Sequence, residues 1–120
     1  MIEALQQFLR PDQVSTGPDD VAEHSIDKWN FAHPPDVVVF AESTADVAAV
    51  LRYAKAEGIP VTTRGAGIGY VGGCVPVQGG IALSVARMNK IREINPADGV
   101  AVVEPGVITV DLQDAAREKG

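Results

Sequence analysis

The stretch TTRGAGIGYVGG, residues 62–73, has the residue types and spacing best suited to chemistry. Seven of the twelve glycines fall between Gly65 and Gly80. Consecutive glycine N–H groups can curl around one anion, and a main chain without side chains lets that anion approach closely. No lysine lies between residues 56 and 89, so the amides and Arg64 must supply the binding. Four or five hydrogen bonds of roughly 1.5–3 kcal/mol each could hold a pyrophosphate.

Residues 67–72 also fit the pattern G-x-G-x-x-G of nicotinamide-nucleotide-binding folds. That pattern must open a helix, and an acidic residue must follow about 20 residues later. Here GGCVPVQGG follows, and its proline and four glycines exclude a helix. The next apolar segment ends in Ala86-Arg87-Met88 and not in an acidic residue. A nicotinamide-binding module is therefore the weaker alternative.

Turn formation is the other alternative for the glycines. Gly79 and Gly80 most simply form a turn, and Gly99 and Gly106 fit turn and strand-end positions better than ligand contacts. Arg64 can either bond a phosphate or pin the glycine loop by bonding the loop's own carbonyls. Its place at the end of a predicted strand slightly favours the pinning role.

The other chemically active side chains fit structural roles. His24 and His33 precede the first predicted buried strand, in loop-like sequence, and Trp29 is interpreted as a packing anchor. Cys74 has no basic neighbour in sequence to activate its thiol, so we interpret it as a small residue beside a ligand. Asn89 fits a turn after a strand, with a ligand contact as the alternative. No spacing indicates a metal site or a catalytic residue.

Charge and composition exclude several classes of function. Sixteen acidic and ten basic residues give a net charge of −6, the wrong sign for non-specific binding to nucleic acid or anionic membranes. No apolar run is long enough to predict a membrane span. The start, MIEALQQFLR, lacks the pattern of a secretory signal. A single cysteine suits a reducing compartment, so we expect a cytoplasmic protein.

Hydrophobic periodicity and turn residues predict the elements that position the glycine loop. Val37–Phe40 is a continuous apolar run, typical of a strand buried on both faces. Ser43, with Asp46 three residues later, predicts the start of a helix that ends at Gly58. The other predicted elements are a helix over 2–10, a loop or brief helical turn over 15–25, strands over 59–64 and 81–85, a hairpin over 90–107, and a last helix N-capped by Thr109 and ending at Gly120.

These elements predict an α/β (α+β) fold, with a small, mostly parallel sheet, flanking helices and a following antiparallel strand pair. The glycine loop leaves a buried parallel strand at its C-terminal end. In open α/β sheets that edge is where ligands bind. The sequence therefore predicts an anion-binding loop at the ligand edge of the sheet.

The segment from Pro34 to Ile91, with VVEPGV further on, resembles a known flavoprotein family. Its strand, capped helix, IPVTTRGAGIG, GGCVP and LSVARMNKI are similar to the start of the FAD-binding domain of the vanillyl-alcohol oxidase/p-cresol methylhydroxylase superfamily. Within it, the likeness is greatest to the flavin subunit of glycolate oxidase, D-lactate dehydrogenase and D-2-hydroxyglutarate dehydrogenase. The resemblance implies the first lobe of a two-lobed FAD-binding domain, with an N-terminal helix and loop over 1–32 and the incomplete domain over 33–120.

The resemblance also implies which residues contact FAD. The expected cofactor-binding residues are Val61, Thr62 and Thr63 toward the adenosine, Arg64, Gly65, Ala66, Gly67, Ile68 and Gly69 around the pyrophosphate, Gly72, Gly73 and Cys74 beside the flavin and ribityl chain, and Glu104, Pro105 and Gly106 on the opposite side. Covalent members carry a histidine four residues after the arginine, where this chain has Ile68, so non-covalent FAD is expected. Ala41 replaces a frequent family proline, which puts the fine geometry of the adenine edge in doubt.

The activity implied by the resemblance is oxidation of a 2-hydroxy acid, of the glycolate or D-lactate type, to the 2-oxo acid by hydride transfer to FAD. The residues that take the hydroxyl proton and grip the carboxylate come, in that family, from a C-terminal domain, so this chain alone is expected to be inactive. Electron-transfer subunits are expected partners. Another enzyme of the same flavin superfamily and a non-catalytic nucleotide-binding α/β module are the alternatives.

Overall fold

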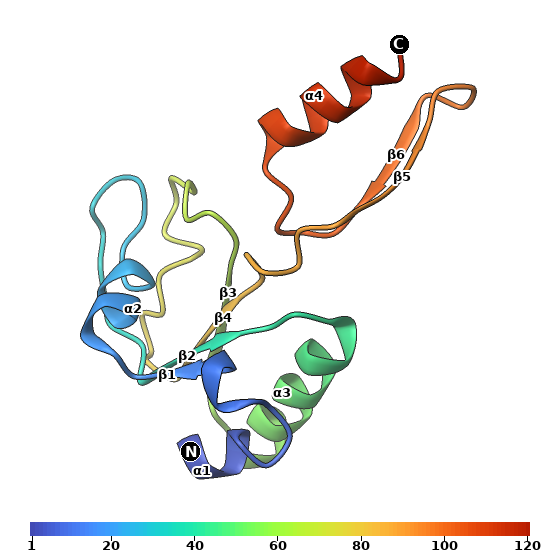
Figure 1. Ribbon diagram of the computed structural model, residues 1–120. Coiled ribbons are helices and arrows are strands. Elements are labelled where there is room, and N and C mark those ends of the chain that lie inside the picture. The colour runs from blue at the N-terminus through green and yellow to red at the C-terminus, as the bar shows by residue number, and fades with distance from the viewer.

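The computed structural model describes residues 1–120 and contains two sheets (Figure 1). The elements, in chain order, are α1 (Ile2–Leu5), the 3-10 helix η1 (Pro11–Gln13), β1 (Val14–Ser15), α2 (Pro18–Glu23), β2 (Val37–Phe40), α3 (Thr44–Glu57), β3 (Val61–Arg64), β4 (Ile81–Ser84), β5 (Ile91–Asn95), β6 (Val100–Val103) and α4 (Thr109–Glu118). The larger sheet has the order β1-β2-β4-β3, in which β2, β4 and β3 run parallel and β1 is antiparallel to β2. Together with the antiparallel pair β5–β6, this confirms the predicted fold class.

The core lies around the two central strands of the larger sheet. Val37, Val38 and Val39 have no exposed surface, as the continuous apolar run predicts for a strand covered on both faces. Leu5 from the N-terminal segment and Val50 from α3 are also fully buried in or against this core. Residues before β2 therefore help to cover the sheet that positions the glycine loop.

Helix α3 begins and ends where the sequence predicts. The Ser43 hydroxyl accepts a hydrogen bond from the Asp46 N–H at 3.1 Å, and the Asp46 carboxylate accepts one from the Glu42 N–H at 2.9 Å. Because β3 follows directly, the helix must end sharply, and Gly58 does this with a left-handed φ of 67°. The helix thereby sets the starting point of the strand that leads into the glycine loop.

Two sequence predictions about helix ends are wrong. The first helix stops at Leu5 instead of continuing to residue 10, because tighter turns follow in which Gln7 and Phe8 bond to residues only three positions earlier. The last helix has Ile108, not Thr109, at its N-cap, and no side chain caps it. Thr109 is the first helical residue.

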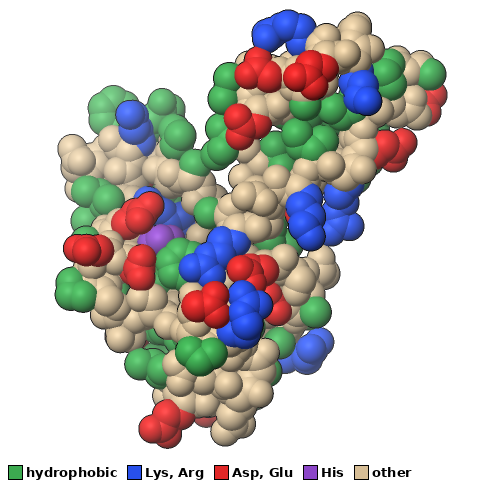
Figure 2. Space-filling view, in the orientation of Figure 1, with side chains coloured by type: hydrophobic (Ala, Val, Ile, Leu, Met, Phe, Trp, Pro, Cys, Tyr) green, Lys and Arg blue, Asp and Glu red, His purple; other side chains and the backbone are tan.

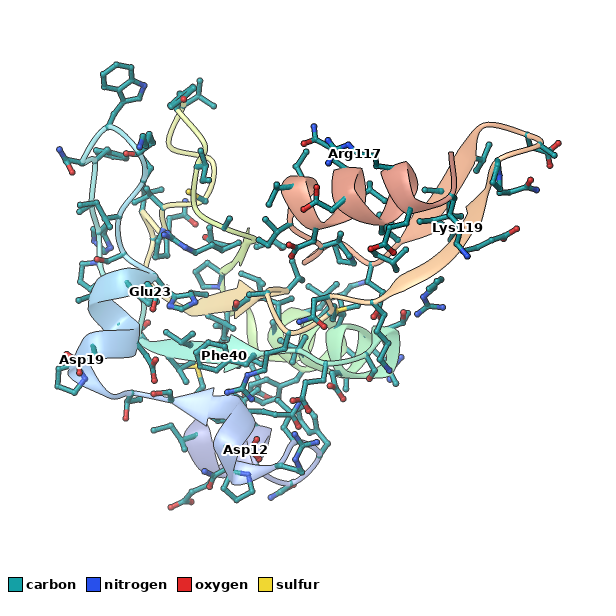
Figure 3. The ribbon with its side chains drawn as sticks, turned by 45° about the horizontal axis from the view of Figure 1, so that its top comes forward. Asp12, Asp19, Glu23, Phe40, Arg117 and Lys119 are labelled. Carbon is teal, nitrogen blue, oxygen red and sulfur yellow. The ribbon has the colours of Figure 1, made fainter.

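The C-terminal elements β5, β6 and α4, here called the hairpin unit (residues 91–120), project away from the larger sheet (Figure 1). Figure 3 shows Arg117 on α4 and Lys119 directly after it, far from Phe40 and Asp12 in the rest of the chain, here called the sheet unit (residues 1–90). No residue of β6 or α4 is buried. The hairpin unit therefore contributes little to the core. Its contacts with the sheet unit are concentrated at the junction between them.

Candidate cofactor-binding site

The parallel strands of the sheet unit end together at one edge. Phe40 of β2, Ser84 of β4 and Arg64 of β3 stand in register, and the glycine loop starts directly after Arg64. The loop then runs to Gly80, where it leads into β4. The predicted position of the loop, at the C-terminal edge of the parallel strands, is confirmed.

The glycine loop presents unused hydrogen-bond donors. None of the backbone N–H groups from Gly65 to Cys74 donates a hydrogen bond to another group of the protein. Gly67 and Gly72 have φ values of +73° and +75°, which turn successive amides in ways that most other residues avoid. Amides that follow such turns form concave anion sites. The loop therefore fits the phosphate groups of a nucleotide.

Arg64 supports the loop from inside the protein. Its side chain is buried, and its Nη1 donates a hydrogen bond of 2.7 Å to the carbonyl of Ile26. A Cβ atom added to Gly67 would lie 2.1 Å from Nη2 of Arg64, so the guanidinium fills the space directly beneath that glycine. The expected bonds from Arg64 to the loop's own carbonyls are absent; its side chain bonds to Ile26 and supports Gly67 by contact.

Cys74 lies at the far end of the same loop. It is half-buried, and its Sγ is 4.0 Å from Nη1 of Arg64. The sulfur is also 3.9 Å from the position that a Cβ at Gly69 would take. Arg64 and Cys74 therefore occupy the space next to Gly67 and Gly69 of the loop.

A cavity of about 180 Å³ opens where the loop meets the junction of the two units. Gly65 and Ala66 line it from the glycine loop, and Gly106 lines it from the turn after β6. The other lining residues are Ala86, Asn89, Ile91, Val107, Ile108 and Asp111. The structure therefore brings Gly106 close to the start of the glycine loop, as expected if both contact the same cofactor.

Glu104 and Pro105 lie on the other side of that junction. The buried Glu104 carboxylate accepts hydrogen bonds from the Lys90 N–H at 2.9 Å and from Nη2 of Arg92 at 3.2 Å. Burial raises the pKa of Glu104, but these hydrogen bonds outweigh it and the pKa lies below its ordinary value. The side chain of Glu104 thus holds the hairpin unit to the sheet unit and does not face the cavity.

The remaining expected site residues lie apart from the cavity. Val61, Thr62 and Thr63 occupy the edge strand β3, where the first two are half-buried and Thr63 is exposed. At Gly72 an added Cβ would lie 3.2 Å from the ring of Phe31. This second glycine therefore allows the loop to pack against a segment that precedes β2.

The contact between residues 28–31 and the glycine loop was not predicted from the sequence. The N–H of Lys28 donates to the carbonyl of Gly69 at 3.3 Å. The rings of Trp29 and Tyr70 lie with their centroids 5.7 Å apart. Trp29 is 70% exposed, so its interpretation as a packing anchor is wrong. The cluster of aromatic residues in WNF was the available signal, but nothing local indicated which loop it would meet.

The two histidines have local structural contacts. Nδ1 of the buried His24 lies 2.8 Å from the carbonyl of Asp20, and its ring packs edge-on against Phe40. His33 is exposed and pairs with the carbonyl of Pro34 at 3.1 Å. No helix of the structure has the length and apolar character needed to cross a membrane.

The parallel sheet, its glycine loop with free amides and the adjoining cavity define a nucleotide-binding α/β domain. A family model described as "FAD binding domain" matches residues 35–120. The chain belongs to this family of FAD-binding domains, which occur in flavin-dependent oxidoreductases. This confirms the family recognised from the sequence.

Individual relatives agree with the family. D-lactate dehydrogenase of Anaerostipes hadrus is 41% identical over 122 residues, which cover 100% of this chain and 26% of that protein. D-2-hydroxyglutarate dehydrogenase of Stutzerimonas stutzeri is 34% identical over 122 residues, with the same coverage of 100% and 26%. The crystal structure of p-cresol methylhydroxylase with substrate bound superposes with a TM-score of 0.83 at 31% identity, over 98% of this chain and 24% of that one. The chain spans about a quarter of the length of these proteins.

Proposed function

We propose that this chain is the FAD-binding portion of an enzyme that oxidises a 2-hydroxy acid, of the glycolate or D-lactate type, to the 2-oxo acid. The observation that carries the proposal is the run of unbonded N–H groups from Gly65 to Cys74 at the C-terminal edge of the parallel strands. The substrate class is supported by the relatives that act on D-lactate and D-2-hydroxyglutarate.

In this proposal the chain's residues bind and orient the cofactor. The amides of residues 65–69 hold the pyrophosphate. The positively charged guanidinium of Arg64 lies on the other side of the Gly67 backbone and attracts it. Gly72, Gly73 and Cys74 border the ribityl chain and flavin. Residues 61–63 lead toward the adenosine, and the 104–106 segment closes the site from the hairpin unit.

When bound, FAD would supply the hydride acceptor. The chain places no histidine or arginine beside the cavity, whose polar side chains are Asn89 and Asp111. The groups that accept the hydroxyl proton and bind the substrate carboxylate are therefore proposed to lie outside these residues. Ile68 offers no nucleophile to the flavin, which supports non-covalent binding.

The experiment uses a protein of the relatives' length that contains this chain. After acid precipitation, the flavin should be found in the supernatant and identified as FAD; flavin in the pellet contradicts non-covalent binding. Under anaerobic conditions D-lactate, D-2-hydroxyglutarate or glycolate should bleach the flavin absorbance. Bleaching by none of a panel of 2-hydroxy acids would refute the substrate class.

A second candidate is oxidation of a para-substituted phenol. It is favoured by the 31% identity and close superposition with p-cresol methylhydroxylase. The same anaerobic test separates the two candidates, with p-cresol in place of the 2-hydroxy acid. Bleaching by p-cresol alone supports this second candidate.

A further inference from the structure

Exposed apolar side chains cluster at the tips of two neighbouring loops, residues 25–34 and 66–74 (Figures 1 and 2). Trp29 is 70% exposed, Tyr70 59% and Val71 95%. The Trp29 and Tyr70 rings pack against each other at an interplanar angle of 55° but leave most of their surface open. Contiguous exposed apolar patches commonly mark interaction or ligand-binding sites.

The backbone around Trp29 is held by hydrogen bonds within its own loop. The buried Asp27 carboxylate accepts hydrogen bonds from the N–H groups of Trp29 at 2.9 Å and Phe31 at 3.0 Å. Asn30 is the one non-glycine residue with a positive φ, 63°, so the turn directly after Trp29 is a strained conformation. A backbone fixed in this way loses little conformational freedom when the segment contacts a ligand.

The tip that carries Trp29 is also attached to the glycine loop. The Lys28 N–H bonds to the Gly69 carbonyl, and Arg64 bonds to the Ile26 carbonyl. Tyr70 belongs to the same backbone run whose N–H groups are free. A nucleotide held by those amides would therefore extend along the loop toward the aromatic pair.

We infer that Trp29 and Tyr70 form an aromatic contact for the flavin ring system of FAD, and this inference rests on the proposed function. A fused planar ring stacks on tryptophan and tyrosine without needing directional hydrogen bonds. Trp29 lies outside residues 35–120, the part that the family model matches. The contact thus adds an N-terminal positioning residue to the cofactor site.

The test compares FAD with ADP, which has the diphosphate and adenosine but no flavin. Trp29→Leu should weaken FAD binding about tenfold, the scale of one lost ring–aromatic stack, and leave ADP binding unchanged. Trp29→Phe keeps a flat ring and should retain most of the affinity. Leu51→Ala, at an exposed apolar residue of α3, is the control for general loss of surface hydrophobicity.

A second readout is the fluorescence of bound flavin, which contact with Trp29 and Tyr70 quenches. Emission should rise in the Trp29→Leu, Tyr70→Leu double variant. If Trp29→Leu unfolds, as judged by circular dichroism, Tyr70→Leu takes its place in both measurements.

Three results would overturn the inference. They are unchanged FAD affinity in Trp29→Leu, an equal loss of FAD and ADP affinity, and a change of oligomeric state with FAD affinity intact. The last result assigns the patch to a second copy of the chain. Wild-type protein that binds neither ADP nor FAD overturns the proposed function itself, so the two failures are distinguishable.

Discussion

The backbone of Gly67 lies so close to the buried guanidinium of Arg64 that no side chain larger than the glycine hydrogen fits between them. The backbone is left-handed there, and any Cβ would meet three atoms of that guanidinium at 2.1–2.9 Å. Arg64 is bonded to Ile26 and cannot move without losing that hydrogen bond. Gly67 thus allows the left-handed turn of the loop and lets the positive charge of Arg64 lie directly beneath it. It also leaves Arg64 in the position from which it bonds to Ile26.

Gly67→Val should destabilise the protein by about 1–3 kcal/mol because it forces a branched side chain into a left-handed conformation. It should also abolish FAD binding, since the amides around it lose their arrangement. Denaturant unfolding and FAD titration measure the two effects. Gly65→Val is the stability control, because Gly65 has open space around its Cβ position. Full FAD affinity in Gly67→Val would show that the loop does not hold the cofactor.

At the scale of elements, Glu104 ties the end of β6 to the start of β5. Its carboxylate joins the Lys90 N–H and the Arg92 guanidinium across the base of the hairpin. Because the folded protein lowers the pKa of Glu104, its ionised form stabilises the fold. That stabilisation is present above the ordinary pKa of 4.5 and is lost as the pH falls below it.

Glu104→Gln should lower the melting temperature at neutral pH and flatten the fall in stability below pH 4.5. Thermal unfolding across this pH range measures both changes. Glu93→Gln, at an exposed position of β5, should keep the wild-type pH profile. Parallel profiles for wild type and Glu104→Gln would show that this carboxylate is not responsible for the acid sensitivity.

At the scale of the whole molecule, two units meet at Gly106. A Cβ there would lie 2.3 Å from the Val85 carbonyl oxygen and 2.8 Å from those of Ala86 and Met88. The Gly106 N–H also donates to the Met88 carbonyl at 2.7 Å. The approach of these backbones sets the position of the hairpin unit and, with it, one wall of the cavity.

Gly106→Ala should cost about 1–3 kcal/mol, as overpacking does in a tight interior. It should also weaken ADP and FAD binding together, because the wall of the cavity moves. Unfolding in denaturant and nucleotide titration provide the measurements. Gly73→Ala, where the Cβ position is open, is the matched control for the stability measurement. Wild-type stability and affinity in Gly106→Ala would contradict the proposed role of the junction.

Attachment of the N-terminal segment is a second property of the whole molecule. Arg10 and Arg87 form ion pairs with Asp12 and Glu42, and these charges gather on the surface of the sheet unit (Figure 2). The Arg87 guanidinium also lies 4.4 Å from the centre of the Phe40 ring. These contacts join residues far apart in sequence at the end of the parallel strands.

The sequence by itself determined the parts of the protein whose cause is local. The apolar run Val37–Phe40, the Ser43 cap and the left-handed stop at Gly58 were predictable because propensity and nearby hydrogen bonds decide them. The order of these elements also placed the glycine loop at the ligand edge, and its motifs identified the family.

The tertiary structure alone decided which distant groups meet. The acceptor of Arg64 and the ring partner of Trp29 depend on contacts across tens of residues, and the separation of Glu104 from the cavity depends on a contact across 14 residues. Several partners of suitable chemistry exist in the sequence for each of these groups. Burial and chain topology decide which of these partners each group contacts, so the choice cannot be read from the residues nearby in sequence.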